Sequence, residues 1–478
     1  MYRKIKKNGY FINDNSQLFS IFAVCMKAIE ENNNYLICNA TLVNEATKKI
    51  VHILVQDGII AEIFPNSTSI DAISRHADTI LIDAKGKYVL PGCIDEHVHF
   101  REPGATHKAD MLSESKAALA GGVTSVMDMP NVNPQTVTNQ LLEDRFAMAK
   151  GKMFCNYSFY LAATDSNFAE VEKMDKKRVC GLKLFIGSST GNMLISNEAV
   201  LDKLFQIKDF PIAVHAENED IICKNSQYFK NKYGEDVPIE KHCEIRSEEA
   251  CVTATKSVME RAEKYGTQLH IMHVTTQKEV ELLRRAPHNI IGEVCTSYLC
   301  FDNRDYQQFG TKLKCNPAIK SEADKLALLK GLQEGVFATV GSDHAPHLLE
   351  EKQNTYFKAP SGIPIVQHTL LVLLDLVAQK KLTLEQLTAV YAHHPAQLYK
   401  IEKRGFVRKG YYADLVIVDM EQKTKVTKEN IYYKCAWSIF EGREFHAKIE
   451  KTFVNGILAF NEGKFVSESP AMELQFER

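Results

Sequence analysis

Short apolar runs alternate with longer segments of helical period through the middle of the chain. We count eight such runs: CIDEHVH (93–99), TSVMDMP (124–130), YSFYLAA (157–163), GLKLFIG (181–187), PIAVHAE (211–217), LHIMHV (269–274), IGEVCT (291–296) and FATVGSDHA (337–345). Amphipathic segments such as 248–266 lie between them, and two more helical segments, 366–379 and 383–399, follow the eighth run. Strands that alternate with helices are typical of a parallel sheet. Eight of them predict an α/β fold, a TIM-type (β/α)8 barrel.

The two ends of the chain have a different pattern. Before residue 90, alternating polar and apolar positions, β-branched residues and turn signals such as Asp57–Gly58 predict short strands. The same pattern returns beyond Arg404. We therefore expect three parts: an N-terminal extension (1–30), a small composite β-sandwich domain from both chain ends (31–90 plus 405–478), and a barrel domain (91–404).

Composition narrows the class of protein. With 45% apolar and 25% charged residues, the 478-residue chain has the composition of a soluble globular protein. Its formal charge of −2 provides no case for nucleic acid or an anionic membrane as a partner. The 12 cysteines are scattered and form no C-x-x-C pair. We expect a cytoplasmic protein with reduced, buried thiols at Cys180, Cys223 and Cys315, which lie in apolar runs.

Metal-binding side chains recur late in the apolar runs. His97 and His99 lie two residues apart in the first run, where side chains point to the same face of a strand. Both imidazoles could bind one metal ion; two histidines hydrogen-bonded in a polar cleft are the alternative. Four other runs carry such a side chain in a late position: Lys183, His215, His273 and Asp343. A barrel would bring all of these to one rim, which favours a two-metal hydrolytic site.

Lys183 is the unusual member of this set. A lysine at a strand end commonly extends its amine to water. Here Leu182, Leu184 and Phe185 surround it, and desolvation lowers the pKa of a lysine towards the neutral amine. A neutral amine can add carbon dioxide and form a carbamate, an anionic ligand able to bridge two cations. We therefore propose as a hypothesis that the amine of Lys183 is carboxylated.

Several motifs together resemble one family: DEHVHFREPG (95–104), GGVTSVMDMPNVNP (121–134), GLKLFIGSSTGNM (181–193), AVHAEN (213–218), KCNPAIK (314–320) and GSDHAPH (341–347). From about residue 35 onwards, the chain is similar to dihydroorotases of the amidohydrolase superfamily. The resemblance implies a distorted (β/α)8 barrel with a composite β-domain. It also implies zinc-dependent, reversible cyclisation of N-carbamoyl-L-aspartate to L-dihydroorotate in pyrimidine biosynthesis. We further expect a homodimer, and an association with aspartate transcarbamoylase is left open.

The resemblance assigns roles to the rim residues. The implied ligands of two zinc ions are His97, His99, Lys183, His215, His273 and Asp343. His97, His99 and Asp343 would hold the more buried ion, and the other two histidines the second. Carboxylated Lys183 would bridge both ions. Asp343 can also take a proton from the attacking water and deliver it to the leaving nitrogen.

Four further residues resemble substrate contacts. Arg101, Asn131 and His347 correspond to the residues that bind the substrate carboxylate, and Asn316 to a contact with the ring. A guanidinium can grip a carboxylate through paired N–H donors, which supports the role of Arg101. A surface salt bridge is the plainer interpretation of this arginine.

Two alternatives and two departures remain. Cyclic amide hydrolases that act on dihydropyrimidine, hydantoin or allantoin do not need an anion grip, and a non-catalytic homologue that scaffolds aspartate transcarbamoylase would be expected to lack ligands. After Glu293–Val294 many relatives carry a histidine pair, whereas this chain has Thr296, Ser297 and Tyr298. The segment 359–369 lacks a second glycine and an acidic residue often found there, so its substrate-side role is open. We interpret His393 and His394 as structural, and His344 as a residue that supports the ligands.

Overall fold

The computed structural model describes residues 34–74, 79–186, 193–195 and 197–478. The predicted N-terminal extension and part of the motif that follows Phe185 lie outside the described residues. Within the described part of the chain, we find no helix with the length and apolar character that a membrane crossing requires.

Eight parallel strands form the predicted barrel. Their order in the sheet follows the sequence without exception, from the first strand to the eighth. The strands are β6 (Cys93–Val98), β7 (Val123–Asp128), β8 (Asn156–Ala162), β9 (Gly181–Ile186), β10 (Ile212–Ala216), β11 (Leu269–Ile271), β12 (Ile290–Cys295) and β13 (Thr339–Gly341). A bridge between Val98 and His344 joins the two ends of this sheet, and the amide of His99 donates to the carbonyl of His344 at 2.8 Å. All eight predicted strands are thus confirmed, and the barrel closes just beyond its last strand.

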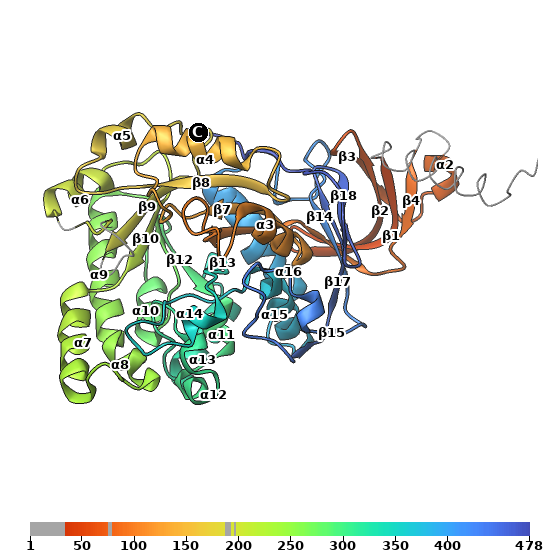
Figure 1. Ribbon diagram of the computed structural model, residues 1–478. Helices are drawn as coiled ribbons and strands as arrows, with labels where there is room; N and C mark the ends of the chain where they lie inside the picture. Colours follow the sequence, from red (N-terminus) through yellow and green to blue (C-terminus); the bar gives the residue numbers. More distant parts are fainter. Residues whose placement is uncertain (1–33, 75–78, 187–192, 196) are drawn as a thin grey trace, which may run out of the picture.

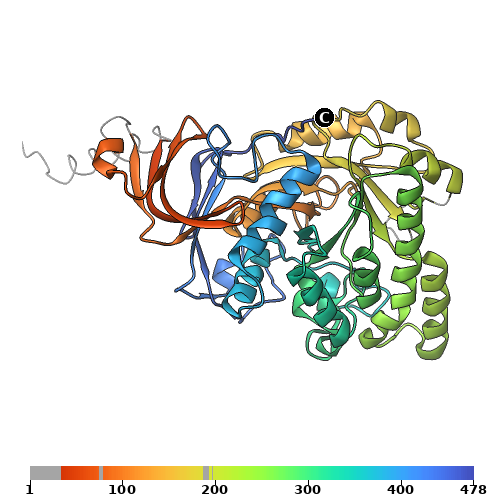
Figure 2. The same cartoon turned by 180° about the vertical axis from the view of Figure 1, so that it is seen from behind.

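Helices surround the barrel strands, as the front and rear views show (Figure 1, Figure 2). Those between the strands are α3 (Met111–Ala120), α4 (Asn139–Ala149), α5 (Phe168–Glu172), α6 (Glu198–Phe205), α7 (Glu219–Tyr233), α8 (His242–Ile245), α9 (Glu248–Tyr265), α10 (Gln277–Leu283), α11 (Thr296–Cys300), α12 (Tyr306–Phe309) and α13 (Glu322–Gln333). After the last strand come α14 (Leu349–Lys352) and α15 (Val366–Ala378).

Local sequence signals define the ends of these helices. Ser247 caps the start of α9, where its side chain accepts from the amide of Ala250, and acidic Glu248 and Glu249 favour the positive end of the helix dipole. Gly266 ends the helix in the left-handed conformation, which glycine adopts without a steric penalty. The predicted segment 248–266 therefore begins and ends where its capping residues lie.

The predicted helix 383–399 is wrong as a single element. It consists of α16 (Leu384–Thr388), a π-helical turn (Ala389–His393) and α17 (His394–Tyr399). Pro395 occupies the first turn of α17, where its missing N–H costs least. The π-helical turn precedes Pro395, which has no N–H to continue the hydrogen bonds of the helix.

The strands from both chain ends form one nine-stranded sheet. Its members are β1 (Tyr35–Asn44), β2 (Thr47–Gln56), β3 (Ile59–Pro65), β4 (Ile80–Asp83), β5 (Tyr88–Pro91), β14 (Leu415–Asp419), β17 (Lys448–Val454), β18 (Ile457–Asn461) and β19 (Lys464–Phe465). β5 pairs with β1 on one side and β14 on the other, so it joins the N-terminal and C-terminal strands. The red and blue strands accordingly lie side by side in Figure 1.

The two arms of this sheet share one apolar core. Tyr35 of β1 and Phe453 of β17 are far apart along the sheet, yet their rings meet edge to face with centroids 5.3 Å apart. Residues of β1, β2, β14 and β17 belong to the same buried cluster. The composite domain is therefore a continuous sheet that packs its own arms together. A helix, α2 (Ile70–Ser74), and a separate two-stranded sheet, β15 (Thr424–Lys425) with β16 (Glu444–Phe445), lie outside this sheet.

The thiols follow the prediction with one exception. All eleven cysteines of the described chain are free, and Cys180 and Cys315 are buried. Cys223 is exposed, which contradicts the prediction of a buried thiol. It lies on α7, and its Sγ donates to Glu219 Oε1, one turn earlier, at 3.3 Å. The apolar run around Cys223 is one stripe of an amphipathic helix, and the cysteine lies on the solvent side of it.

Candidate active site

All ten site residues predicted from the sequence line a single cavity of about 240 Å³. The cavity opens where the barrel strands end, which is where this fold carries its sites. Its lining has two parts. The histidine wall consists of His97, His99, Lys183, His215, His273 and Asp343. The loop wall consists of Arg101, Asn131, Asn316, His347, Pro360, Ser361 and Gly362.

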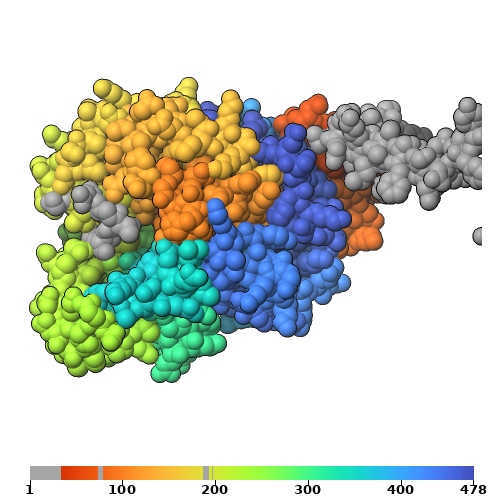
Figure 3. All heavy atoms as spheres, viewed as in Figure 1, coloured from red at the N-terminus to blue at the C-terminus, as the bar shows by residue number. Residues whose placement is uncertain are grey.

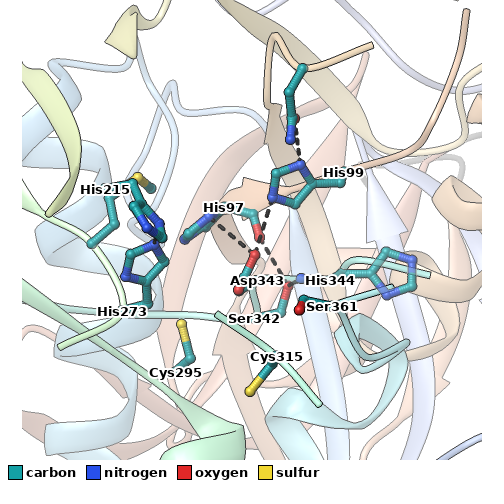
Figure 4. Close-up of polar contacts among 12 residues, drawn as sticks. His97, His99, His215, His273, Cys295, Cys315, Ser342, Asp343, His344 and Ser361 are labelled. Carbon is teal, nitrogen blue, oxygen red and sulfur yellow. Dashed lines mark hydrogen bonds and ion pairs between the residues drawn. The ribbon is translucent and has the colours of Figure 1, made fainter. Parts of the chain in front are cut away.

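His97, His99 and Asp343 converge on one point of the histidine wall (Figure 4). Asp343 Oδ1 lies 3.2 Å from His97 Nε2 and 3.1 Å from His99 Nε2. Burial alone would raise the pKa of Asp343, but the two imidazoles hold it at about 2. Burial lowers the pKa of His99 to about 4. Asp343 is therefore ionised near pH 7, where burial keeps the imidazole of His99 neutral.

His215 and His273 form a second group on the other side of the same wall (Figure 4). His215 Nδ1 lies 2.8 Å from His273 Nε2. Burial lowers the pKa of both rings, so each is neutral near pH 7. The two facing nitrogens can share one proton in a hydrogen bond, or both can offer lone pairs to a cation.

Lys183 lies at the base of this wall and does not reach water. Its side chain is buried, and Nζ lies 2.8 Å from Met272 Sδ. Burial lowers the pKa of Lys183 to about 8, so a substantial fraction of the amine is neutral at mildly alkaline pH. This environment has the desolvated character that the sequence predicted, and the carboxylation itself stays a prediction.

Two buried carboxylates hold the histidines from behind, and sequence reasoning missed both roles. Glu293 Oε1 accepts from His97 Nδ1 at 2.9 Å and from the backbone amide of His273 at 2.9 Å. Glu217 Oε2 lies 2.9 Å from His215 Nε2 and forms an ion pair with Arg246. The sequence did contain a signal for these roles, because each glutamate is an acidic residue within one of the predicted strands that form the site. A carboxylate on the distal nitrogen fixes the tautomer of an imidazole whose other nitrogen binds a metal.

This set of donors fits a pair of divalent cations. One group offers two imidazole nitrogens and an ionised carboxylate within 4.8 Å of one another. The other offers two imidazole nitrogens that already face each other at 2.8 Å. Nitrogen and oxygen donors of this kind, with carboxylates behind the rings, are typical of zinc sites in hydrolases.

The loop wall presents a cation to the cavity. Arg101 is partly buried, and its guanidinium contacts the carbonyl of Pro346 at 3.2 Å and His347 Nε2 at 3.1 Å. Among the residues that the structure describes, no carboxylate forms an ion pair with it. Burial lowers the pKa of Arg101 to about 10, although nearby carboxylates oppose the shift. The interpretation of this arginine as a surface salt bridge therefore does not hold.

Two amides complete the loop wall. Asn131 Oδ1 accepts from His99 Nδ1 at 2.7 Å, which links the loop wall to the histidine wall. Asn316 Oδ1 is buried and lacks a hydrogen bond within the described structure. Such a group is costly unless a ligand or water satisfies it. Tyr298 donates to the carbonyl of Pro317 at 2.8 Å and so supports the segment of Asn316.

The segment with the open role, 359–369, does contribute to the cavity. Pro360, Ser361 and Gly362 line it. Gly362 has a φ of 139°, and a Cβ atom there would lie 2.4 Å from the carbonyl of Ala345, so no other residue fits. Lys352 is fully buried, and its amine donates to the carbonyls of Lys314, Pro360 and Gly362 at 2.8–2.9 Å. The hydrogen bonds of Lys352 therefore hold this segment in place.

The histidines interpreted as structural or supporting lie outside the cavity lining. His344 is buried, its Nε2 donates to Glu114 at 2.8 Å, and its Nδ1 accepts from the amide of Ile365. His393 contacts the amide of Glu45 and the carbonyl of Gly405. Both rings therefore anchor backbone around the barrel.

One more segment reaches the loop wall from the C-terminal part of the chain. Trp437 is buried, and its indole N–H donates to the carbonyl of His347 at 2.8 Å. In the space-filling view, the cyan segment that contains α14 packs against the blue C-terminal part and the orange segment that follows β6 (Figure 3). The position of His347 thus depends on three segments that are distant in sequence.

Most of the chain is similar in sequence to known proteins. A dihydroorotase from Methanosphaera stadtmanae is 30% identical over 430 residues, which cover 88% of this chain and 94% of that protein. A dihydroorotase from Halobacterium salinarum is 31% identical over 390 residues, 81% of this chain and 90% of that protein. Among solved structures, an L-hydantoinase (dihydropyrimidinase) from Arthrobacter aurescens superimposes with a TM-score of 0.86 and 26% identity, and covers 92% of this chain and 99% of its own.

The family is also recognised directly from the sequence. The family model described as the amidohydrolase family matches residues 88–458, which include every residue of both walls. Together with the eight-stranded barrel and two groups of candidate metal ligands at its rim, this match leads to one conclusion: the chain belongs to the amidohydrolase family.

Proposed function

We propose that the protein is a dihydroorotase, which catalyses the zinc-dependent, reversible cyclisation of N-carbamoyl-L-aspartate to L-dihydroorotate. Relatives named dihydroorotase, 30–31% identical to most of this chain, support the assignment. A role in pyrimidine biosynthesis, a cytoplasmic location and a homodimer stay predictions that accompany it.

The position of Arg101 is the observation that carries the choice of substrate. A partly buried guanidinium without a carboxylate partner among the described residues calls for an anion from the ligand. His347 lies beside it, with Nε2 3.1 Å from the guanidinium. Dihydroorotate bears a carboxylate on its ring, whereas dihydropyrimidine, hydantoin and allantoin have neutral rings. The L-hydantoinase with a similar fold therefore supports the architecture more than the substrate.

The two groups of the histidine wall would hold two zinc ions. His97, His99 and Asp343 would hold one ion and His215 and His273 the other, and a carboxylated Lys183 would supply a further anionic ligand. Ions bound there would lower the pKa of a bound water and polarise the amide carbonyl of the substrate. Glu293 and Glu217 hold the imidazoles in the tautomers that leave the cavity-facing nitrogens open.

The proton transfer belongs to Asp343. Its pKa of about 2 keeps the carboxylate ionised at neutral pH, ready to accept a proton from the attacking water. The same carboxyl group can then deliver that proton to the ring nitrogen that leaves. Arg101 and His347 bind the substrate carboxylate, and Asn316 offers its buried amide to the ring. A scaffold protein without activity would have no need of this complete set.

A direct assay tests the proposal. Purified, zinc-loaded protein is offered dihydroorotate, hydantoin and allantoin in parallel, and the same assay is repeated after metal removal and after zinc is added back. We expect turnover of dihydroorotate, its loss without metal and its return with zinc. Turnover of hydantoin with none of dihydroorotate would assign the protein to the neutral-ring hydrolases, and full activity without metal would refute the metal-dependent mechanism.

A further inference from the structure

A second cavity lies between the barrel and the nine-stranded sheet. Its volume is about 280 Å³, compared with about 240 Å³ for the active-site cavity, and the two have no lining residue in common. Helix α15 forms one side, and β15, β17 and β18 contribute to the others (Figure 1). The second cavity is therefore separate from both the histidine wall and the loop wall.

The inner part of the second cavity is apolar and aromatic. Leu371 of α15, Val426 and Ile449 of β17 line it, and all three side chains are buried. The rings of Tyr432 and Phe460 line it as well and meet edge to face, with centroids 6.4 Å apart. Sites for small molecules commonly combine such an apolar lining with a few polar groups. This part of the cavity therefore suits an aliphatic or aromatic group of a ligand.

One buried imidazole lines the same cavity. His368 lies in the first turn of α15 and is 1% exposed. Its Nδ1 lies 3.0 Å from the hydroxyl of Tyr433 and 3.4 Å from that of Ser438, neither of which lines the cavity. Among the described residues, none forms a hydrogen bond with its Nε2. A buried polar atom of this kind is costly unless a ligand or water satisfies it, so Nε2 is open to a polar atom in the cavity.

Lysines lie around the mouth of the second cavity. Lys423, Lys425 and Lys448 line it, and Glu462 is the one acidic residue among the described residues of the lining. The first two lysines are exposed and the third is partly exposed. Lys423 is paired with Glu444 at 2.7 Å, whereas Lys425 and Lys448 have no ion pair in the part of the chain that the structure describes. The lining thus carries an excess of positive charge where the cavity meets water, which favours an anion.

We propose that the second cavity is a binding site for a small organic anion. The apolar part of the ligand would lie between α15 and the strands β17 and β18, and its phosphate or carboxylate among the lysines at the mouth. His368 would contact a polar atom of the ligand from inside. This binding is independent of the proposed reaction, because no residue of the second cavity belongs to either wall of the active site.

Calorimetric titration of the full chain tests the site. The probe is 1-naphthyl phosphate, and its two halves, 1-naphthol and inorganic phosphate, are titrated separately. Lys425→Met combined with Lys448→Met removes the unpaired cations of the mouth, and Leu371→Trp fills the apolar part. Lys428→Met is the matched control, because Lys428 is an exposed lysine of the same segment that does not line the cavity. Arg101→Lys reports binding of the probe to the active site.

The probe should bind more tightly than either half. The double lysine variant should raise its Kd by roughly three- to tenfold, as expected for two partly exposed charges, and Leu371→Trp should abolish binding. Lys428→Met and Arg101→Lys should leave the Kd unchanged.

Three results would overturn the inference. Inorganic phosphate that binds as tightly as the probe would indicate an adventitious ion only. A Kd that is the same in the double lysine variant as in Lys428→Met would exclude the lysines of the mouth, and loss of binding in Arg101→Lys would place the probe in the active site. The lysine variants decide the outcome even if Leu371→Trp does not fold. None of these titrations measures turnover, so a failure of the proposed function would leave them valid.

Discussion

The histidine wall and the loop wall face the same cavity but are built differently. Every residue of the histidine wall lies in a barrel strand or within two residues of its end. The loop wall is carried by connections after β6, β7 and β13 and by the segment before α13, where no ladder of backbone hydrogen bonds defines the geometry. Sites on strands are held more accurately than sites on loops.

Buried lysines that donate to backbone carbonyl groups hold the loop wall in place of a strand ladder. Lys352 binds three carbonyl groups, and Lys314 binds those of Tyr356 and Ala359 at 2.6–2.7 Å. Burial lowers the pKa of Lys352 to about 7 and that of Lys314 to about 8, because it disfavours the charged form of each amine. The residues proposed for the chemistry are therefore held by the barrel sheet. Those proposed for substrate recognition are held by a few hydrogen bonds from buried side chains. Changes in the first wall should therefore affect turnover, and changes in the second should affect substrate binding.

The largest effect is expected for Asp343→Asn in the histidine wall. An amide cannot accept the proton of the attacking water, so kcat should fall by roughly 10²–10⁴-fold. Zinc content is measured beside kcat, so that a lost ligand is distinguished from a lost base. Asp419→Asn, in β14 of the nine-stranded sheet, serves as the control. A rate within twofold of the natural enzyme would exclude Asp343 as the proton carrier.

A smaller effect is expected for Arg101→Lys in the loop wall. An ammonium group cannot reproduce the paired donors of a guanidinium, so kcat/KM for dihydroorotate should fall by roughly 10–100-fold, mainly through KM. Zinc content should stay unchanged, in contrast to changes in the histidine wall. The matched control is Arg404→Lys, because Arg404 is a buried arginine paired with Asp414 outside the cavity. A decrease confined to kcat would mean that Arg101 belongs to the chemistry and not to recognition.

The smallest effect on activity is expected for Lys352→Met. Three carbonyl groups lose their common donor, so the free energy of unfolding should decrease by about 1–3 kcal/mol. KM should rise severalfold because the segment of Ser361 and Gly362 is less well held. Denaturant titration and steady-state kinetics measure the two quantities. Lys87→Met, which removes an ion pair with Glu450 in the nine-stranded sheet, is the control for stability alone. A destabilised protein with unchanged KM would show that the clamp supports the fold without shaping the cavity.

The sequence predicted the histidine wall well because its geometry follows from strand periodicity. His97, His215 and His273 occupy late positions in three apolar runs, and a parallel barrel places such positions on one rim. The eight strands were found for the same reason. The roles of loop-wall residues such as Arg101 and Asn316 were assigned only through the resemblance to a family.

Other features have no comparable signal in a single sequence. Lys314 and Lys352 donate to backbone carbonyl groups, and a sequence does not reveal such partners. The exposure of Cys223 depends on which side of α7 faces the barrel, and an apolar run by itself does not decide this. The division of 383–399 comes from a π-helical turn just before Pro395, and apolar periodicity alone does not predict such a turn.

The hydrogen bond between Trp437 and His347 has a practical consequence. The chain contains only this one tryptophan, so all of its indole fluorescence originates next to the loop wall. The indole donates to the backbone carbonyl of His347, so a shift of this residue on anion binding should change the emission of Trp437. We therefore expect that titrations with unlabelled compounds can be followed by intrinsic fluorescence, without a dye.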